Sequence, residues 1–159
     1  MMTTPVWKIL VLMSMLGMTM RYQETRKLNQ TTYVTDYLLR NGYLTTVRVS
    51  SGHMDIVDPN GIRVAYADIE EPVEIPPGAQ ATLKIRVVLS EPLSVLTKRY
   101  PSDAQVTFKG HIIYDTGWLS WLFGYGRLEF EEKVQMSMIL EYLGLYEIET
   151  TPPLVHLAN

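Results

Sequence analysis

The chain has no cysteine, which excludes a disulfide framework, a thiolate metal site and a cysteine nucleophile. It is also poor in charge, since 19% of its 159 residues are Asp, Glu, Lys or Arg, against about a quarter in an average soluble domain. The formal net charge of -3 leaves no excess of basic residues, on which nucleic-acid binding normally rests. With 47% hydrophobic residues, a chain of this length is expected to form one domain with a terminal extension.

The sequence also lacks the motifs of common catalytic and metal sites. It contains no Gly-x-Ser-x-Gly, no His-Glu-x-x-His and no glycine-rich loop that precedes a helix. The three histidines are far apart and without the spacing of metal ligands: His53, His111 and His156. His111 is expected on the outer face of its strand, in contact with solvent. We therefore expect no enzyme activity, no metal, no cofactor and no small-molecule substrate.

Residues 5–20 form the longest apolar stretch, "PVWKILVLMSMLGMTM". Three interpretations stay open for residues 1–22: a membrane anchor, a signal peptide without an Ala-x-Ala-like cleavage site, or a helix packed within the folded protein. A spanning helix needs about 17 to 25 residues, so an anchor would need Lys8 to extend toward the interface and Tyr22 to lie there. The residues expected in this anchor are Trp7, Ile9, Leu10, Val11, Leu12, Met13 and Leu16.

Two features bear on the orientation of a single-pass membrane protein. Lys8 lies on one side of the apolar stretch and Arg21, Arg26 and Lys27 lie on the other, so the positive-inside rule favours a cytoplasmic domain. Asn29 opens an Asn-x-Thr glycosylation sequon, which has a meaning only outside the cytoplasm. We take an extracytoplasmic domain, with Asn29 as a glycosylation site, as the expectation.

After a polar linker over 23–30, residues 31–149 read as a domain of short strands, and 150–159 as a C-terminal tail. Alternating apolar residues, together with β-branched and aromatic residues, predict strands over 31–39, 43–50, 53–57, 62–67, 79–90, 104–115 and 127–138, with 142–149 as a continuation. These elements predict an all-β fold, a seven-stranded antiparallel β-sandwich with one short helix, preceded by an N-terminal hydrophobic helix.

Local turn and cap signals separate these elements. Turns are expected at Asn41-Gly42 and at Ser51-Gly52. The sequence Asp-Pro-Asn-Gly at 58–61 suits a type I turn, which makes 53–67 a hairpin. Ser90 is expected to cap a helix over 91–99 that buries two leucines, Leu93 and Leu96.

One strand carries an irregularity. Glu132 interrupts the apolar face of the strand over 127–138. Either a bulge turns this side chain away from the core, or the strand lies at the rim of the sheet.

The most unusual segment is "TGWLSWLFGYG", residues 116–126, a connection between two strands that is bounded by glycines. Two interpretations stay open. The segment either folds back and closes one end of the sandwich, or it forms an exposed apolar contact loop for a membrane surface or a protein partner. The residues that would form this contact are Trp118, Leu119, Trp121, Leu122, Phe123 and Tyr125.

Two long stretches, "NGIRVAYADIEEPVEIPPGAQATLKIRVVLS" and "AQVTFKGHIIYDT", are separated by the short leucine-bearing helix. This succession, within about residues 31–138, resembles the late-embryogenesis-abundant type 2 family, also called the water-stress and hypersensitive-response (WHy) domain, which has archaeal and bacterial members. The resemblance rests on the Asn60-Gly61 hairpin, on Ile75-Pro76-Pro77-Gly78 before a long alternating strand, and on the Lys109-Gly110 strand. The family usually carries Asn-Pro at the end of its first strand, where this chain has Asn41-Gly42.

The resemblance implies a seven-stranded β-sandwich with one short helix, no enzyme activity and a link to desiccation and other stress. Some members are tethered by an N-terminal hydrophobic segment, and the family motif carries over no catalytic or ligand residues. We therefore expect a membrane-tethered β-sandwich with a binding, protective or stress-related role. The alternative is a structural subunit of a membrane complex or extracellular filament, which would find its protein partner or self-assemble through the N-terminal helix.

Overall fold

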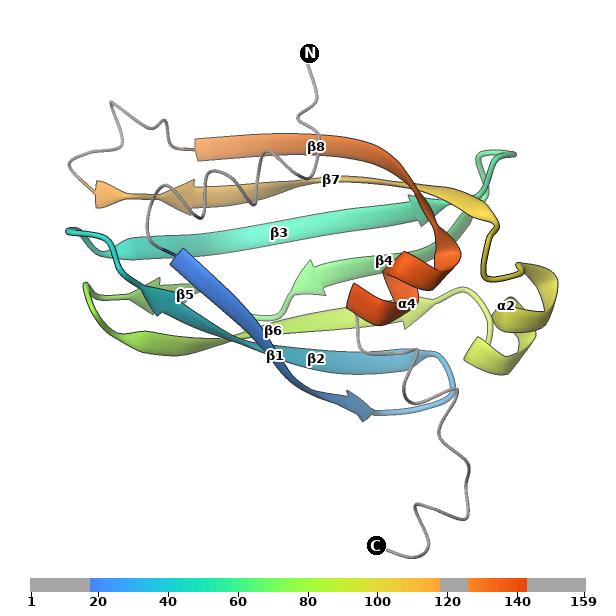
Figure 1. Ribbon diagram of the computed structural model, residues 1–159, viewed down its shortest axis with the longest axis horizontal. Helices are drawn as coiled ribbons and strands as arrows, with labels where there is room; N and C mark the ends of the chain where they lie inside the picture. The colour runs from blue at the N-terminus through green and yellow to red at the C-terminus, as the bar shows by residue number, and fades with distance from the viewer. Residues whose placement is uncertain (1–17, 118–125, 143–159) are drawn as a thin grey trace, which may run out of the picture.

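The computed structural model describes residues 18–117 and 126–142, which form eight strands and two short helices (Figure 1). In chain order the elements are β1 (Met18–Lys27), β2 (Thr32–Asn41), β3 (Val47–Val57), β4 (Arg63–Ile69), β5 (Val73–Ile75), β6 (Gln80–Leu89), α2 (Leu93–Arg99), β7 (Gln105–Asp115), β8 (Gly126–Gln135) and α4 (Met136–Tyr142). The strands pair antiparallel in the order β1-β2-β6-β4-β3-β7-β8, and β5 pairs with β3. The all-β, antiparallel expectation is confirmed, with eight described strands in place of seven.

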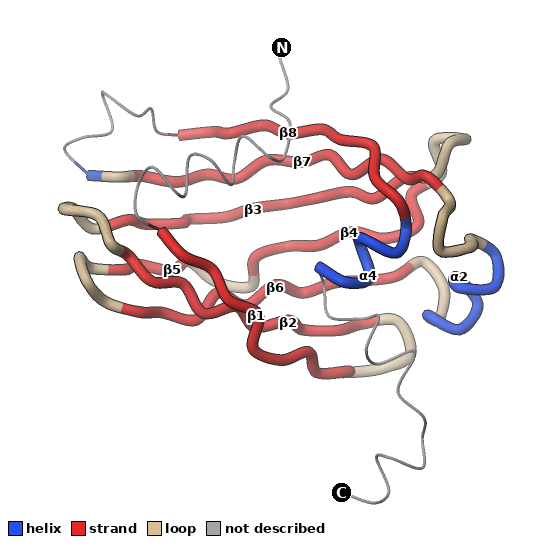
Figure 2. The backbone as a smooth tube through the Cα atoms, viewed as in Figure 1, coloured by secondary structure: helices blue, strands red, loops and turns tan. Residues whose placement is uncertain are grey.

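The pairing defines two opposite ends of the sheet. At one end, which we call the Asn41 end, β1, β3, β6 and β8 begin and β2, β5 and β7 finish. The opposite end, which we call the helix end, carries α2, α4 and the connection between β1 and β2 (Figure 2).

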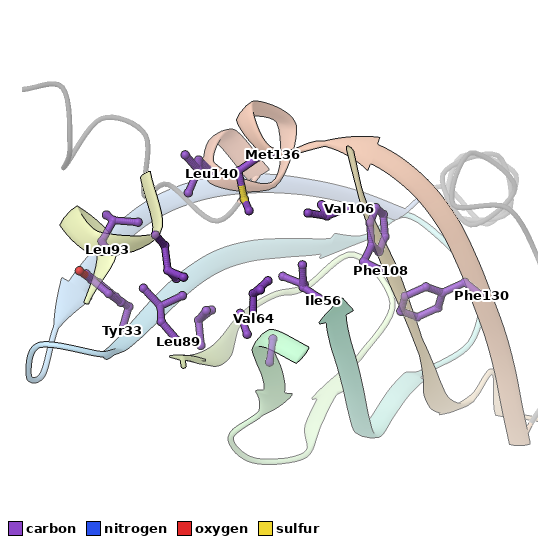
Figure 3. Packing of buried hydrophobic residues seen from close by; sticks show 14 residues of the cluster. Tyr33, Ile56, Val64, Leu89, Leu93, Val106, Phe108, Phe130, Met136 and Leu140 are labelled. Atoms are coloured by element: carbon purple, nitrogen blue, oxygen red, sulfur yellow. The ribbon is translucent and has the colours of Figure 1, made fainter. Parts of the chain in front are cut away.

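Two clusters of buried apolar side chains form the core. The larger one draws on six strands and both helices, and the sheet curves around it in the manner of a β-sandwich. Figure 3 shows Met136 and Leu140 of α4, together with Leu93 of α2, facing the same interior as Tyr33 and Ile56. The smaller cluster lies toward the Asn41 end and consists of Met18, Tyr37, Leu39, Val47, Val73, Ile75 and Leu83.

The hairpin over 53–67 is confirmed as β3 and β4, and its turn is held by one aspartate. The backbone oxygen of Asp58 accepts a hydrogen bond from Gly61 N at 2.9 Å, and Gly61 has a φ of 82°. The Asp58 carboxylate accepts hydrogen bonds from Tyr100 Oη at 2.8 Å and from the backbone N–H groups of Asn60 and Ile62, both at 2.9 Å. The bond from Tyr100, followed by that from Ile62, holds the pKa of Asp58 below its ordinary value.

The N-terminal boundary differs from the expectation. Residues 18–22, assigned to the end of the hydrophobic helix, and most of the linker over 23–30 form β1, which pairs with β2 along its length. Met18 is only 8% exposed and belongs to the smaller core cluster. The rest of β1 is mostly exposed on both faces, as an edge strand can be, so its sequence lacks the alternation that reveals a half-buried strand.

The predicted turn at Ser51-Gly52 is wrong. β3 runs through both residues, and the irregularity appears only as a shift in the pairing with β7, between Val49 and Ser51. A β-bulge of this kind adds one residue and bends a strand without ending it. The strands expected over 43–50 and 53–57 are therefore one element, which begins at Val47, and residues 43–46 belong to a loop and not to the strand expected there.

The C-terminal strand is shorter than expected. β8 stops at Gln135, and 136–142 turns into α4, whose start is fixed by hydrogen bonds from Met136 N to Ala104 O at 2.8 Å and from Ser137 N to Ser102 O at 3.0 Å. Met136 and Leu140 are buried at the i, i+4 spacing of one helix face. Residues 143–159, which include most of the continuation over 142–149 and the tail over 150–159, lie outside the described residues.

Two smaller expectations also have an outcome. The helix over 91–99 is confirmed as α2, with Leu93 and Leu96 buried, but Ser90 does not cap it: Pro92 takes the N-cap position and makes no side-chain cap hydrogen bond. Glu132 lies on β8, which pairs with β7 without a register shift and forms an edge of the sheet. Of the two alternatives, the rim position is the one observed.

Candidate functional site

Asn41 is the structural centre of the Asn41 end. Its side chain is fully buried, and its Nδ2 donates hydrogen bonds to the backbone oxygens of Thr45 and Ile75, both at 2.8 Å. Its Oδ1 accepts a hydrogen bond from Tyr43 N at 2.8 Å. One amide thus joins the end of β2, the loop over 42–46 and the end of β5. The sequence at Asn41-Gly42 predicted no more than a turn.

A second contact joins the loop over 42–46 to the end of β7. Thr45 Oγ1 donates a hydrogen bond to the backbone oxygen of Thr116 at 2.5 Å. Gly117 follows with a φ of 75°, and its N–H donates to Asp115 Oδ1 at 2.8 Å. Thr116 Oγ1 is buried, and it is the single buried side-chain polar atom without a hydrogen-bond partner in the described part of the chain. The chain therefore enters residues 118–125 from the Asn41 end.

Leu44 is the most exposed of the large apolar side chains that the structure describes, with 81% of its surface accessible. It lies in the loop over 42–46, between the anchored residues Asn41 and Thr45. Two exposed arginines belong to the same end, on the outer face of β1 and β2: Arg40 is paired with Thr19, and Arg21 is two residues further along β1. The Asn41 end thus combines an exposed leucine with basic side chains.

The outer face of the sheet carries a cluster of titratable groups around His53. His53 Nδ1 lies 2.6 Å from Asp68 Oδ1, and His53 Nε2 lies 3.0 Å from Asp55 Oδ1, so both ring nitrogens are engaged. His111, on the neighbouring strand, has its ring centroid 6.4 Å from that of His53, and Arg127 Nη2 lies 3.3 Å from its Nδ1. His111 faces outward as expected but is half-buried among these groups.

Within residues 18–117 and 126–142, no group of three or more acidic or histidine side chains is arranged to hold a metal ion. The carboxylates around His53 instead bind the imidazole itself. A hydrogen-bonded pair in this arrangement stabilises a charged histidine on the surface of the sheet.

The two histidines have opposite pKa directions. Burial would lower the pKa of His53, but hydrogen bonds from its ring to Asp68 and Asp55 raise that pKa above its ordinary value. Burial, followed by the charge of Arg127, lowers the pKa of His111. Because the folded-state pKa of His53 is raised, its contribution to stability is complete below pH 6.5 and is lost as the pH rises through the folded-state pKa.

Replacing Asp68 with Asn should therefore lower the pKa of His53, because the shorter of its two carboxylate contacts loses its charge. An NMR titration of the His53 ring protons measures this directly. Glu71→Gln removes the same charge from an exposed residue of the connection between β4 and β5 and should leave the titration unchanged. An unaltered His53 titration in Asp68→Asn would contradict the hydrogen-bonded pair.

Most of the residues that the sequence singled out lie outside the described residues, namely the anchor residues over 7–16 and the contact loop over 118–125. Asn29 is described, and it is exposed in the connection between β1 and β2. Its Oδ1 accepts hydrogen bonds from Thr31 N at 2.9 Å and Thr31 Oγ1 at 3.2 Å. Neither of the described helices, α2 or α4, is long and apolar enough to cross a membrane.

No protein-family model matches the chain, and no curated protein sequence is similar to it. Similar solved structures include a protein from Archaeoglobus fulgidus, with 17% identity and a TM-score of 0.47 over 73% of this chain and 92% of that chain. The PapD-like domain 7 of human CEP192 has 10% identity and a TM-score of 0.38 over 76% and 84%. A FixG-related protein from Vibrio parahaemolyticus has 10% identity and a TM-score of 0.34 over 75% and 94%. Similarities of this size assign neither a family nor a function.

Proposed function

We propose that this protein is a non-enzymatic β-sandwich of the WHy type that is held at a membrane by its N-terminal segment and has a binding, protective or stress-related role. The motifs behind the family resemblance occupy adjoining strands of the sheet: the β3–β4 hairpin, β6 and β7. The observation that carries the tether is the position of Met18, which lies near the end of the apolar stretch and is buried in the core. The apolar residues are thus attached to the folded domain itself.

The length of the apolar stretch favours attachment in one leaflet over the spanning helix expected from the sequence. Because β1 takes residues 18–20, residues 5–17 remain, which is 13 residues. As a helix they would be about 20 Å long, against a hydrocarbon core of about 30 Å. A segment of this length is typical of interfacial or signal-like sequences, and Lys8 and Trp7 suit the headgroup region.

Introducing two lysines into the segment tests the tether. In the full chain, Leu12→Lys with Leu16→Lys should lower the partition onto phospholipid vesicles about 100-fold, because two leucines leave the lipid. Flotation of the protein with vesicles of phosphatidylcholine and phosphatidylglycerol measures this.

The matched control is Thr3→Lys with Thr4→Lys, which adds the same charge outside the apolar stretch and should bind at least as well as the wild type. Equal flotation of both double variants would show that the apolar segment does not hold the protein at the membrane.

The second candidate is a structural subunit that assembles with itself or with other proteins. It is favoured by the two outer strands, β1 and β8, which are each ten residues long and pair with only one neighbouring strand among the described residues. Open edges of this length can pair with the edge of another chain. The molar mass of the detergent-solubilised full chain, measured by light scattering, distinguishes the two candidates. The mass of a monomer is expected for the tethered domain, and the masses of several oligomers are expected for the structural subunit.

A further inference from the structure

Three positions that lie far apart in the sequence meet at the Asn41 end. Met18, where residues 1–17 join the domain, pairs with Asn41. Leu44 follows three residues later, at most about 11 Å along the chain. Thr45 is hydrogen-bonded to Thr116, where the chain enters residues 118–125. The N-terminal apolar stretch therefore joins the domain at the same end that exposes Leu44.

No flexible linker separates the N-terminal segment from this end among the residues that the structure describes. A linker over 23–30 would allow the domain to lie up to about 26 Å from the membrane surface. Those residues instead belong to β1 or to its turn, and the strand begins at Met18, whose side chain is buried in the core. Residues 5–17 are therefore joined directly to the Asn41 end, with no described linker between them and the sheet.

The chemistry of the Asn41 end suits a lipid interface. Leu44 is 81% exposed on a loop that Asn41 and Thr45 hold in place. Arg21 and Arg40 are exposed at the same end of the sheet, on the outer face of β1 and β2. An end that carries both an exposed apolar side chain and arginines is attracted by the acyl boundary and by anionic headgroups.

We propose that the Asn41 end is the membrane-facing surface of this domain, with Leu44 inserted at the lipid interface and Arg21 and Arg40 against anionic headgroups. The proposal rests on the tether proposed above and adds the orientation of the sandwich. The helix end, which carries the β1–β2 turn with Asn29 and the β3–β4 turn with Ile62, points away from the membrane (Figure 1).

The absence of cysteine makes a direct test possible, because a single introduced cysteine takes a unique label. Leu44→Cys and Ile62→Cys, each in the full chain, are labelled with an environment-sensitive nitrobenzoxadiazole dye. Ile62 is the matched control, since it is an apolar residue with 60% of its surface exposed at the opposite end. With vesicles of phosphatidylcholine and phosphatidylglycerol, the dye at 44 should brighten severalfold, shift to the blue and be quenched by spin-labelled lipids. The dye at 62 should change little.

Each other outcome has a distinct meaning. If the protein floats with the vesicles while both dyes respond equally, or the dye at 62 responds more, the orientation is wrong and the tether stands. If the protein does not float, both proposals fail. If the dye at 44 shifts to the blue as the protein concentration rises in the absence of vesicles, Leu44 contacts a second copy of the chain, and the proposal that it inserts into lipid is wrong.

A variant without a label supplies an independent readout. Leu44→Asp should weaken vesicle binding on the order of tenfold, whereas Ile62→Asp should leave it unchanged. Both side chains are highly exposed, so neither change should unfold the domain. Equal binding by the two variants would contradict the insertion of Leu44.

Discussion

Replacing Gly110 with Ala is expected to destabilise the domain by about 3 kcal/mol or more, at the upper end of what overpacking in a core costs. Gly110 lies in the middle of β7, opposite Met54 of β3. A Cβ atom added there would lie 1.9 Å from the backbone oxygen of His53 and 2.8 Å from Met54 Cα. Both are main-chain atoms of the paired strand, so no side-chain rotation can relieve the contact. Urea unfolding of the full chain, followed by circular dichroism, measures the loss.

Gly52→Ala is the matched control, because Gly52 is also a glycine at the pairing of β3 with β7. A Cβ atom added at Gly52 would lie 2.7 Å from Cδ1 of Ile69, the end of a flexible side chain. That side chain can rotate, so the loss should stay near 1 kcal/mol, the range of a small packing change. Similar losses in the two variants would show that the close approach of β3 to Gly110 is not what requires glycine.

The parts of the fold that the sequence predicted depend on local signals. The hairpin over 53–67 has its turn residues in sequence, and α2 has two leucines at helical spacing before Pro101. The strand β6 alternates because one of its faces is buried over most of its length. Such elements carry the information for their own conformation within about ten residues.

The parts that could not be predicted depend on partners distant in sequence. β1 resembles a polar linker because an edge strand with both faces exposed has no alternation, and only its pairing with β2 defines it. Residues 51–52 carry a turn signal, yet β7 pairs across them and keeps the strand continuous. In both cases long-range pairing overrides local preference.

In the candidate sites too, contacts that are local in sequence could be predicted and contacts between distant segments could not. Asp68 lies on the return strand of the same hairpin as His53, so the sequence places the two residues close together. Counting back from the turn over 58–61 would pair His53 with Tyr66, whereas the observed register, which shifts between Ile56 and Val57, places Asp68 opposite it instead. His111 could not be placed beside His53 in this way, since its strand joins β3 from 58 residues further along the chain. Leu44 falls in residues 43–50, for which the sequence predicts a strand, so nothing in the sequence marks it as an exposed loop residue. That it belongs to the same end of the sheet as Met18 follows only from the pairing of β1 with β2.

Asn41→Ala should lower the free energy of unfolding by about 3 kcal/mol, which corresponds to roughly 10 °C in Tm. The change removes three hydrogen bonds and leaves the backbone oxygens of Thr45 and Ile75 without their donor in a buried site. An unsatisfied buried polar group costs about 1–3 kcal/mol, more than a hydrogen bond contributes on the surface. Differential scanning calorimetry of the full chain gives both quantities.

The matched substitution is Asn60→Ala, in the exposed turn between β3 and β4, which should change stability by less than about 0.5 kcal/mol. Asn41→Asp separates shape from hydrogen bonding, because a carboxylate of the same size cannot donate to the oxygens of Thr45 and Ile75 and brings a charge into a buried site. It should therefore be at least as destabilising as Asn41→Ala. If Asn41→Asp instead retained the stability of the wild type, the two donated hydrogen bonds could not be what holds the loop over 42–46, and the fixed position of Leu44 would need another cause.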